Sequence, residues 1–170
     1  MTADPAPRAA ARLGLVTALL IVAADQASKL WLLYVYELGR RGVVTILPVL
    51  DLVLTWNYGI SYGLFQQEGA GRWVLIGIAV VAVVLLGLWL RRAETRLTAL
   101  ALGLIIGGAV GNAIDRLAYG AVADFVLFHV TTESFRFSWY VFNLADAAIV
   151  AGVVGLLYES FFVTGAPKAP

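Results

Sequence analysis

Residues 73–90 read WVLIGIAVVAVVLLGLWL, a continuous stretch without a charged side chain. A second uncharged stretch, LTALALGLIIGGAVGNAI, occupies residues 97–114. A helix needs about 20 predominantly apolar residues to cross the hydrocarbon core of a bilayer, and both stretches come close to that length. They predict two membrane-spanning helices, over about 73–90 and 97–116, joined by a very short connection.

Two further apolar segments carry polar residues toward one end. Residues 13–36 begin as an apolar run and then include Asp25 and Lys29. Residues 140–161 include Asp146 close to their start. We interpret both segments as spans, which predicts an all-α membrane protein with four transmembrane helices.

The first apolar segment also has features of a cleaved signal peptide. Arg8 and Arg12 precede it, and the small residues Ala23 and Ala24 end its apolar part. Three more spans follow, however, and cleavage would leave no soluble domain behind. We therefore interpret this segment as a retained first helix.

The composition agrees with a membrane protein. Hydrophobic residues make up 61% of the chain and charged residues 14%, which is more apolar than soluble domains are. The length fits a single domain over residues 1–170. The 12 Lys and Arg residues form no basic stripe, so nucleic acid is not an expected partner. With no cysteine and one histidine, we expect no metal, no cofactor and no thiol chemistry.

Arginine residues indicate how the helices are oriented. Arg91, Arg92 and Arg96 lie in the short connection between the second and third spans, and such positively charged connections usually stay in the cytoplasm. Both chain termini are then cytoplasmic. The two longer connections, about 37–72 and 117–139, are expected outside.

The first outer connection has the composition of β-strands. Residues 43–56 are rich in Val, Ile, Leu and Thr, and Pro48 interrupts them. A glycine-bearing run from Asn57 to Gly63 follows. This pattern predicts a small β element on the outer membrane face.

Glycines in the third span recur every four residues. Gly103, Gly107 and Gly111 therefore lie on one helix face. Small residues at this spacing allow helices in lipid to approach closely. We expect this face to pack against another helix.

Several polar residues are expected inside or beside the membrane. A charged side chain at mid-membrane costs about 3 kcal/mol on insertion scales, so such residues usually face a bundle interior and serve a function. In the expected topology they all lie near the outer interface. The residues of this kind in the spans are Asp25, Lys29, Asn112, Asp115, Arg116, Asn143 and Asp146.

Their spacing groups these residues on helix faces. Asn112 and Asp115 are three residues apart on the third span and share a face, as do Asn143 and Asp146 on the fourth. Asp124 lies in the short outer connection between these spans. The third and fourth spans, joined by this connection, should therefore bring Asp124 and Asp146 to the two sides of the outer end of the helix pair.

Two carboxylates that share a site suggest acid–base chemistry. Because ionisation of both carboxyl groups is energetically unfavourable, one keeps a proton. The pair can then act as general base and general acid around one water molecule. Which of Asp124 and Asp146 holds the proton stays open. Three alternatives also remain: a structural pair that caps the helix ends, a small four-helix transporter that uses carboxylates as a proton relay, and a non-catalytic membrane scaffold that uses the glycine face for assembly.

Five blocks of sequence occur in order along the four spans. They are Asp25-Gln26-Ala27-Ser28-Lys29, Asn57-x-Gly59, Gly108-Ala109-Val110-Gly111-Asn112-Ala113-Ile114-Asp115-Arg116, Val122-Ala123-Asp124-Phe125 and Phe142-Asn143-Leu144-Ala145-Asp146. In order and spacing they resemble the lipoprotein signal peptidases (signal peptidase II), over residues 13 to about 162. One departure is Ser61-Tyr62, where many members have Ala and Phe, which concerns details of substrate contact.

The resemblance implies an aspartic endopeptidase of the bacterial inner membrane, with its active site near the outer face. It would cut before a diacylglyceryl-modified cysteine and release the signal peptide. The partners would be a lipid-modified prolipoprotein and membrane lipid, with the enzyme acting as a monomer. The outer β cradle and short amphipathic helix of the family would correspond to about 40–68. The catalytic pair falls on Asp124 and Asp146, and the residues expected to support the site or hold substrate are Asn57, Gly59, Gly108, Asn112, Asp115, Arg116, Asn143, Ala145, Asp25 and Lys29.

Some of these residues also have simpler interpretations. Asp115 and Arg116 would form an ion pair or cap that supports the site. Asp25 and Lys29, spaced i and i+4, can pair with each other and stabilise the first helix. His129 is expected to be a loop residue at the membrane interface.

Overall fold

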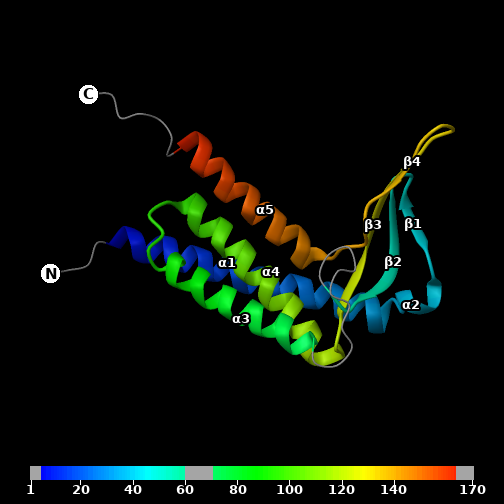
Figure 1. The fold of residues 1–170 in the computed structure, drawn as a ribbon, viewed down its shortest axis with the longest axis horizontal. Coiled ribbons are helices and arrows are strands. Elements are labelled where there is room, and N and C mark those ends of the chain that lie inside the picture. The colour runs from blue at the N-terminus through cyan, green and yellow to red at the C-terminus, as the bar shows by residue number, and fades with distance from the viewer. Residues whose placement is uncertain (1–4, 60–70, 164–170) are drawn as a thin grey trace.

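A computed structural model describes residues 5–59 and 71–163 of the chain. Long helices form a bundle, and a four-stranded antiparallel sheet lies at one end of it (Figure 1). The expectations for residues 60–68 of the outer segment, and for Ser61 and Tyr62, fall outside the described residues.

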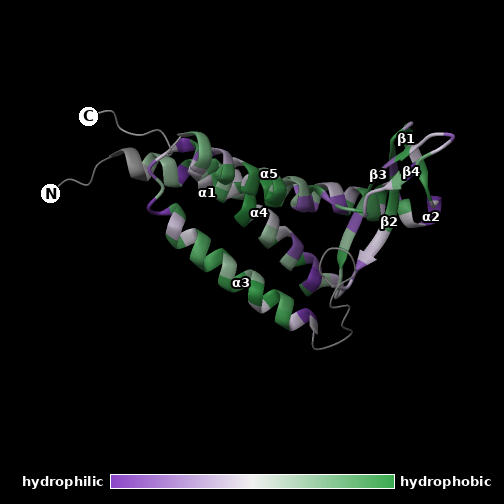
Figure 2. Ribbon diagram, turned by 45° about the horizontal axis from the view of Figure 1, so that its top comes forward, coloured by the Kyte–Doolittle hydropathy of each residue, from purple (hydrophilic) through white to green (hydrophobic). Residues whose placement is uncertain are grey.

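The four expected spanning helices are present. Each is long and apolar enough to cross a membrane. Figure 2 shows α3 coloured as hydrophobic over most of its length, and only 6% of its apolar window is buried inside the protein, so most of that surface is left for lipid. The helices are α1 (Pro5–Leu30) with a π-helical turn η1 (Trp31–Val35), α3 (Gly71–Leu90), α4 (Arg96–Tyr119), and α5 (Leu144–Tyr158) with a π-helical turn η3 (Glu159–Val163).

Helix α4 packs against each of the other three long helices, and glycines make the closest approaches possible. A Cβ atom on Gly107 would lie 2.7 Å from the backbone oxygen of Ala18 in α1. On the other side, a Cβ atom on Gly152 of α5 would lie 2.5 Å from the backbone oxygen of Ala101. Gly103 and Gly111 also face α1, so the packing role predicted for this glycine face is confirmed.

The sheet combines strands from both expected outer connections. Its order is β1 (Val44–Leu47), β2 (Leu50–Asn57), β3 (Val122–Thr131) and β4 (Arg136–Ser138), with all neighbours antiparallel. Strand β2 pairs with β3, so Asn57 lies opposite Val122 and Thr55 opposite Asp124. This pairing holds the first outer connection against the start of the second.

Strands β3 and β4 correct the sequence interpretation, which limited the β element to about 40–68. Asp124 was placed in a short connection, but it lies near the start of a ten-residue strand. His129 was expected in a loop, yet it lies in the same strand with its Nε2 3.0 Å from a carboxylate oxygen of Asp51. Strand β3 pairs along much of its length with β2, which is distant in sequence, and local composition does not register such pairing.

Two helix boundaries differ from those expected. Helix α5 begins at Leu144, not near residue 140, because Phe142 pairs with Val126 of β3 and Asn143 caps the helix. Helix α4 continues one turn past residue 116 to Tyr119, where Gly120 ends it with a φ of 81°. In the described part of the outer segment, α2 (Leu38–Arg41) is a single turn that precedes the strands. The expected amphipathic helix within about 40–68 falls partly on residues 60–68, outside the described residues, and stays a prediction.

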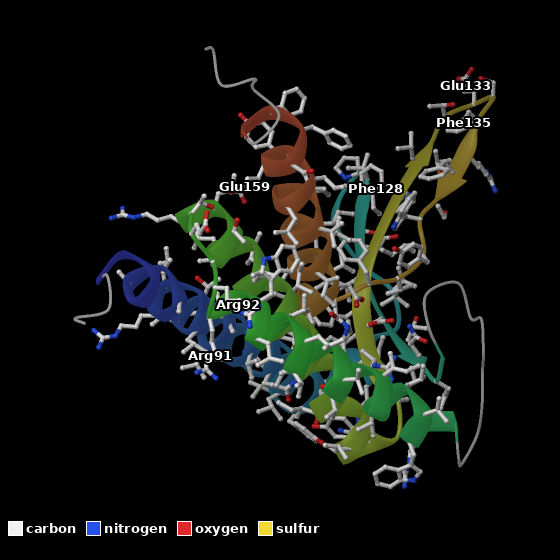
Figure 3. All side chains as sticks on the ribbon, turned by 60° about the vertical axis from the view of Figure 1, so that its left-hand side comes forward. Arg91, Arg92, Phe128, Glu133, Phe135 and Glu159 are labelled. Carbon is white, nitrogen blue, oxygen red and sulfur yellow. The ribbon has the colours of Figure 1, made fainter. Side chains whose placement is uncertain are left out.

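The two ends of the bundle differ in chemistry. The sheet lies at one end, and the α3–α4 connection lies at the other (Figure 1). Figure 3 shows Arg91 and Arg92 of this connection on the side away from the β3–β4 hairpin, which carries Glu133 and Phe135 near its tip. Both arginines are exposed.

Candidate active site

Asp124 and Asp146 are joined through the side chain of Asn143. The Nδ2 of Asn143 donates to Oδ1 of Asp124 at 2.7 Å. The Oδ1 of Asn143 accepts from the backbone N–H of Asp146 at 2.9 Å, while Oδ2 of Asp146 accepts from the backbone N–H of Asn143 at 3.2 Å. This reciprocal capping box begins α5 and fixes Asp146 in its first turn. The residue that caps the helix therefore also holds the second carboxylate.

Each of the two carboxylates accepts a further amide hydrogen bond. Asn112 of α4 donates from Nδ2 to Oδ1 of Asp146 at 2.8 Å. Asn57 at the end of β2 donates from Nδ2 to Oδ2 of Asp124 at 3.1 Å. The amides of Asn143 and Asn112 are joined in turn by a 3.1 Å hydrogen bond. Three asparagines from separate elements thus bind the pair into one network.

A turn after β2 orients Asn57. The Oδ1 of Asn57 accepts from the backbone N–H of Gly59 at 3.1 Å, an Asx turn. The backbone oxygen of Gly59 accepts from the guanidinium of Arg116 at 2.8 Å. Arg116 therefore anchors the turn and does not form the ion pair with Asp115 that the sequence suggested, because neighbouring helical residues point in different directions.

Burial is the main influence on the acidity of Asp124. The side chain is 2% exposed, and burial raises its pKa to about 7, with the nearby charge of Asp146 acting in the same direction. The hydrogen bonds from Asn57 and Asn143, and the charge of Lys29, oppose this rise. At neutral pH Asp124 is therefore protonated for a substantial fraction of the time.

A buried ion cluster lies beneath these two carboxylates. The Nζ of Lys29 is 2.8 Å from Oδ2 of Asp25 and 2.8 Å from Oδ2 of Asp115, and each of the three side chains is at most 1% exposed. The Asp25–Lys29 pairing suggested by their spacing is confirmed. Asp115 is paired with Lys29 across the α1–α4 interface.

The structure adds Gln26 to the polar residues that the sequence singled out. Its Nε2 donates to Oδ1 of Asp115 at 2.9 Å, and to Oδ2 of Asp25 at 3.1 Å. The sequence signal that could have identified Gln26 is its position between Asp25 and Lys29 in the first motif. Gly108 and Ala145 also meet, since a Cβ atom on Gly108 would collide with the backbone oxygen of Ala145. All of the predicted site residues thus lie in or beside one polar cluster at the sheet end of the bundle.

Comparison with known proteins shows that this chain is similar to one family of membrane peptidases. Residues 17–162 match the family model described as signal peptidase (SPase) II. The lipoprotein signal peptidase of Nitrobacter hamburgensis is 61% identical over 94% of this chain and 98% of its own length. That of Methylorubrum extorquens is 56% identical over 94% of this chain and 90% of its own. These matches give no support to the transporter alternative.

A solved structure of a bacterial membrane enzyme has a similar fold. It aligns with a TM-score of 0.74 over 92% of this chain and 93% of its own, at 22% identity. The helix bundle and its attached sheet are therefore an architecture already seen in a membrane enzyme.

Proposed function

Because the chain belongs to the signal peptidase II family, we propose that this membrane peptidase cleaves signal peptides from diacylglyceryl-modified prolipoproteins, before the lipidated cysteine, by an aspartic mechanism. The observation that carries the aspartic mechanism is the network in which Asn143 binds Asp124 and caps the helix that holds Asp146. It supports a pair of carboxyl groups acting on one water molecule.

The two carboxyl groups have different surroundings, which suggests different roles. Asp146 lies in the first turn of α5, where the positive end of the helix dipole favours a negative charge, and it accepts hydrogen bonds from Asn112 and from a backbone N–H. We assign it as the general base that takes a proton from the attacking water. Asp124, whose pKa is raised to about 7, donates its proton to the carbonyl oxygen of the scissile peptide.

The remaining steps return both protons. After the water oxygen bonds to the carbonyl carbon, the tetrahedral intermediate collapses, and the bond from carbon to the cysteine nitrogen breaks. The proton held by Asp146 moves to the departing nitrogen, while Asp124 recovers its proton from the hydroxyl of the intermediate. The products are the signal peptide with a free carboxyl group and the lipoprotein with a cysteine amine at its N-terminus, and a proton passes from the carboxyl group to the amine or to solvent after release.

A hollow beside Asp146 supports a lipid-modified substrate. Its volume is about 360 Å³, and Trp139, Tyr140, Phe142 and Val150 contribute to its walls together with Asp146. Aromatic and aliphatic walls suit acyl chains, and they would place the lipidated cysteine next to the carboxylate.

The proposed orientation follows from the charges at the two ends of the bundle. Arg91, Arg92 and Arg96 favour a cytoplasmic α3–α4 connection. Both termini would then be cytoplasmic, and the sheet and active site would face the outside of the inner membrane, where signal peptides emerge. We propose one single-domain chain as the working unit.

Cleavage of a defined substrate tests the function. The purified protein in detergent, incubated with a diacylglyceryl-modified prolipoprotein, should release the signal peptide, and the same precursor without the lipid should stay intact. Asp146→Asn serves as the matched inactive control. Equal cleavage of the modified and unmodified precursors would reject the proposed substrate class, and no cleavage of either by folded protein would reject the activity.

A further inference from the structure

The ion cluster of Asp25, Lys29 and Asp115 contacts the backbone next to both proposed catalytic aspartates. Asp115 accepts the backbone N–H of Ala123, the residue before Asp124, at 3.1 Å. Asp25 accepts the backbone N–H of Ala145, the residue before Asp146, at 3.1 Å. The two carboxylates of the cluster thus each hold the chain one residue upstream of one member of the pair.

Lys29 connects these two contacts. Its ammonium lies 2.8 Å from the carboxylate oxygens of both Asp25 and Asp115, so a single buried cation links the start of β3 to the start of α5. A hydrogen bond of 3.4 Å to Oδ1 of Asn112 adds a third link, to the amide that binds Asp146. The strand and the helix that carry the pair are otherwise joined in this region by the side chain of Asn143 and by pairing between Val126 and Phe142.

We propose that Lys29 is a positioning residue whose charge, acting through Asp25 and Asp115, sets the separation of the Asp124 and Asp146 carboxyl groups. This inference rests on the proposed function of the pair. It assigns to Lys29 a role beyond neutralising Asp25 in the first helix, because that neutralisation would not require contact with Asp115.

The geometry explains why a cation is required at this position. Asp25 and Asp115 each direct carboxylate oxygens at a backbone N–H and at Nζ of Lys29, and without the cation two buried like charges would repel each other. Their separation would increase, and each would move the backbone that it holds. A displacement of about 1 Å at a catalytic group is enough to lower turnover about a hundredfold.

The cluster also acts on the pair electrostatically. The charged groups that act on Asp124 are Asp146 and Lys29, and those that act on Asp146 are Lys29 and Asp25. Both carboxylates also act on Arg116. Among these, the positive charge of Lys29 favours the ionised form of Asp124. Removal of this charge should therefore move the Asp124 limb of the pH–rate profile to higher pH, an effect that a purely structural role would not produce.

The test compares Lys29→Met with Lys29→Arg in the full-length protein. Lys29→Met should lower kcat about a hundredfold with little change in KM, and should move the Asp124 limb upward by about one pH unit. Lys29→Arg keeps the charge, so it should retain much of the wild-type kcat, and the Asp124 limb of its pH–rate profile should lie at the wild-type pH. Glu159→Gln is the matched control, because it removes another buried charge, bound to Thr95 and Thr98 far from the pair, and should leave the profile unchanged.

The outcome depends on whether Lys29→Met folds. If folded Lys29→Met keeps kcat within about twofold of wild type with an unshifted profile, the proposal is wrong. If Lys29→Met does not fold, the variant Asp25→Asn/Lys29→Met/Asp115→Asn takes its place, because its asparagine oxygens still accept both backbone N–H groups without buried charge. An unshifted Asp124 limb in that folded variant would overturn the proposal, because the charge of Lys29 is absent from it. Absence of cleavage by wild-type protein would instead reject the proposed function.

Discussion

Asparagine and aspartate side chains at the sheet end of the bundle form one hydrogen-bonded network. Asn143 is its central member, since it binds Asp124, Asn112 and the backbone of Asp146. Replacement of either proposed catalytic aspartate by asparagine should therefore lower activity without lowering stability. The amide keeps the size of the side chain and most of its hydrogen bonds.

Asp124→Asn and Asp146→Asn should each lower cleavage by about a hundredfold or more, since proton transfer by a positioned carboxyl group contributes that much. The melting temperature in detergent should stay close to wild type. The double variant should be no less active than either single one, because the two groups act as a unit. Turnover and thermal unfolding measured on the same preparations check this. Near-normal turnover in either single variant would show that the carboxylates are not the reacting pair.

Asp124 should also make stability depend on pH. Its pKa is raised to about 7 in the folded protein, so the folded state binds this proton more tightly than the unfolded chain does. The corresponding stabilisation is present below the ordinary carboxyl pKa of about 4 and is lost as pH rises through about 7. Asp124→Asn lacks this dependence, so its melting temperature should fall less than that of wild type between about pH 5 and pH 8. Parallel pH curves for the two proteins would contradict the raised pKa.

The residue pattern of the site was predictable because polar residues in a membrane span have few reasons to be there. The motifs include Asp25, Lys29 and Asp115, and the i, i+4 spacing predicted the Asp25–Lys29 pair that the structure contains. The partner of Asp115 was not predictable, because the Lys29–Asp115 contact depends on the rotation of α1 against α4. That rotation depends on how the glycines of α4 pack against α1.

Helices and strands were predicted from the sequence with unequal success. A spanning helix satisfies its own backbone hydrogen bonds, so composition alone indicates α3 and α4. Strand β3 depends on β2, which lies 67 residues away measured from Asn57 to Asp124, and no local pattern records that pairing. The pairing of Phe142 with Val126 of β3, together with the Asn143 cap, explains why α5 starts after residue 143.

Close packing of α1 on α4 provides a prediction at the scale of elements. Gly107→Val would place side-chain atoms against the backbone of Ala18 and should destabilise the bundle by about 1–3 kcal/mol. Gly77→Val on α3 is the matched control, because nothing lies within 4 Å of its Cβ position in the described structure, and it should have little effect. Thermal unfolding of both variants in the same detergent measures the difference. Equal destabilisation by both would show that helix propensity, and not packing, controls the outcome.

The whole molecule is polarised along the bundle axis. The α3–α4 connection with its exposed arginines lies at one end, and the sheet lies at the other (Figure 1). The polar cluster adjoins the sheet, since Asp115 binds the backbone next to Asp124 of β3. A signal peptidase requires this arrangement, because its substrate emerges on the outer side of the membrane. The orientation itself can be measured without any substrate.

A reporter active in the cytoplasm should function when fused after Arg92. A reporter active outside the cytoplasm should function when inserted at Ser134, in the exposed turn between β3 and β4. The reason is the density of positive charge in the α3–α4 connection. The reverse pattern of reporter activity would place the site on the cytoplasmic face and would contradict the proposed function.

The Asp25–Lys29 ion pair has a consequence for biogenesis. Helix α1 is synthesised and inserted before α4, so Asp115 does not yet exist when Lys29 first meets the lipid. Because Asp25 and Lys29 lie one helical turn apart, they can neutralise each other within the same helix, at 2.8 Å in the finished protein. The first helix can thus enter the bilayer as a neutral unit, with its cation already in place to receive Asp115 when α4 follows.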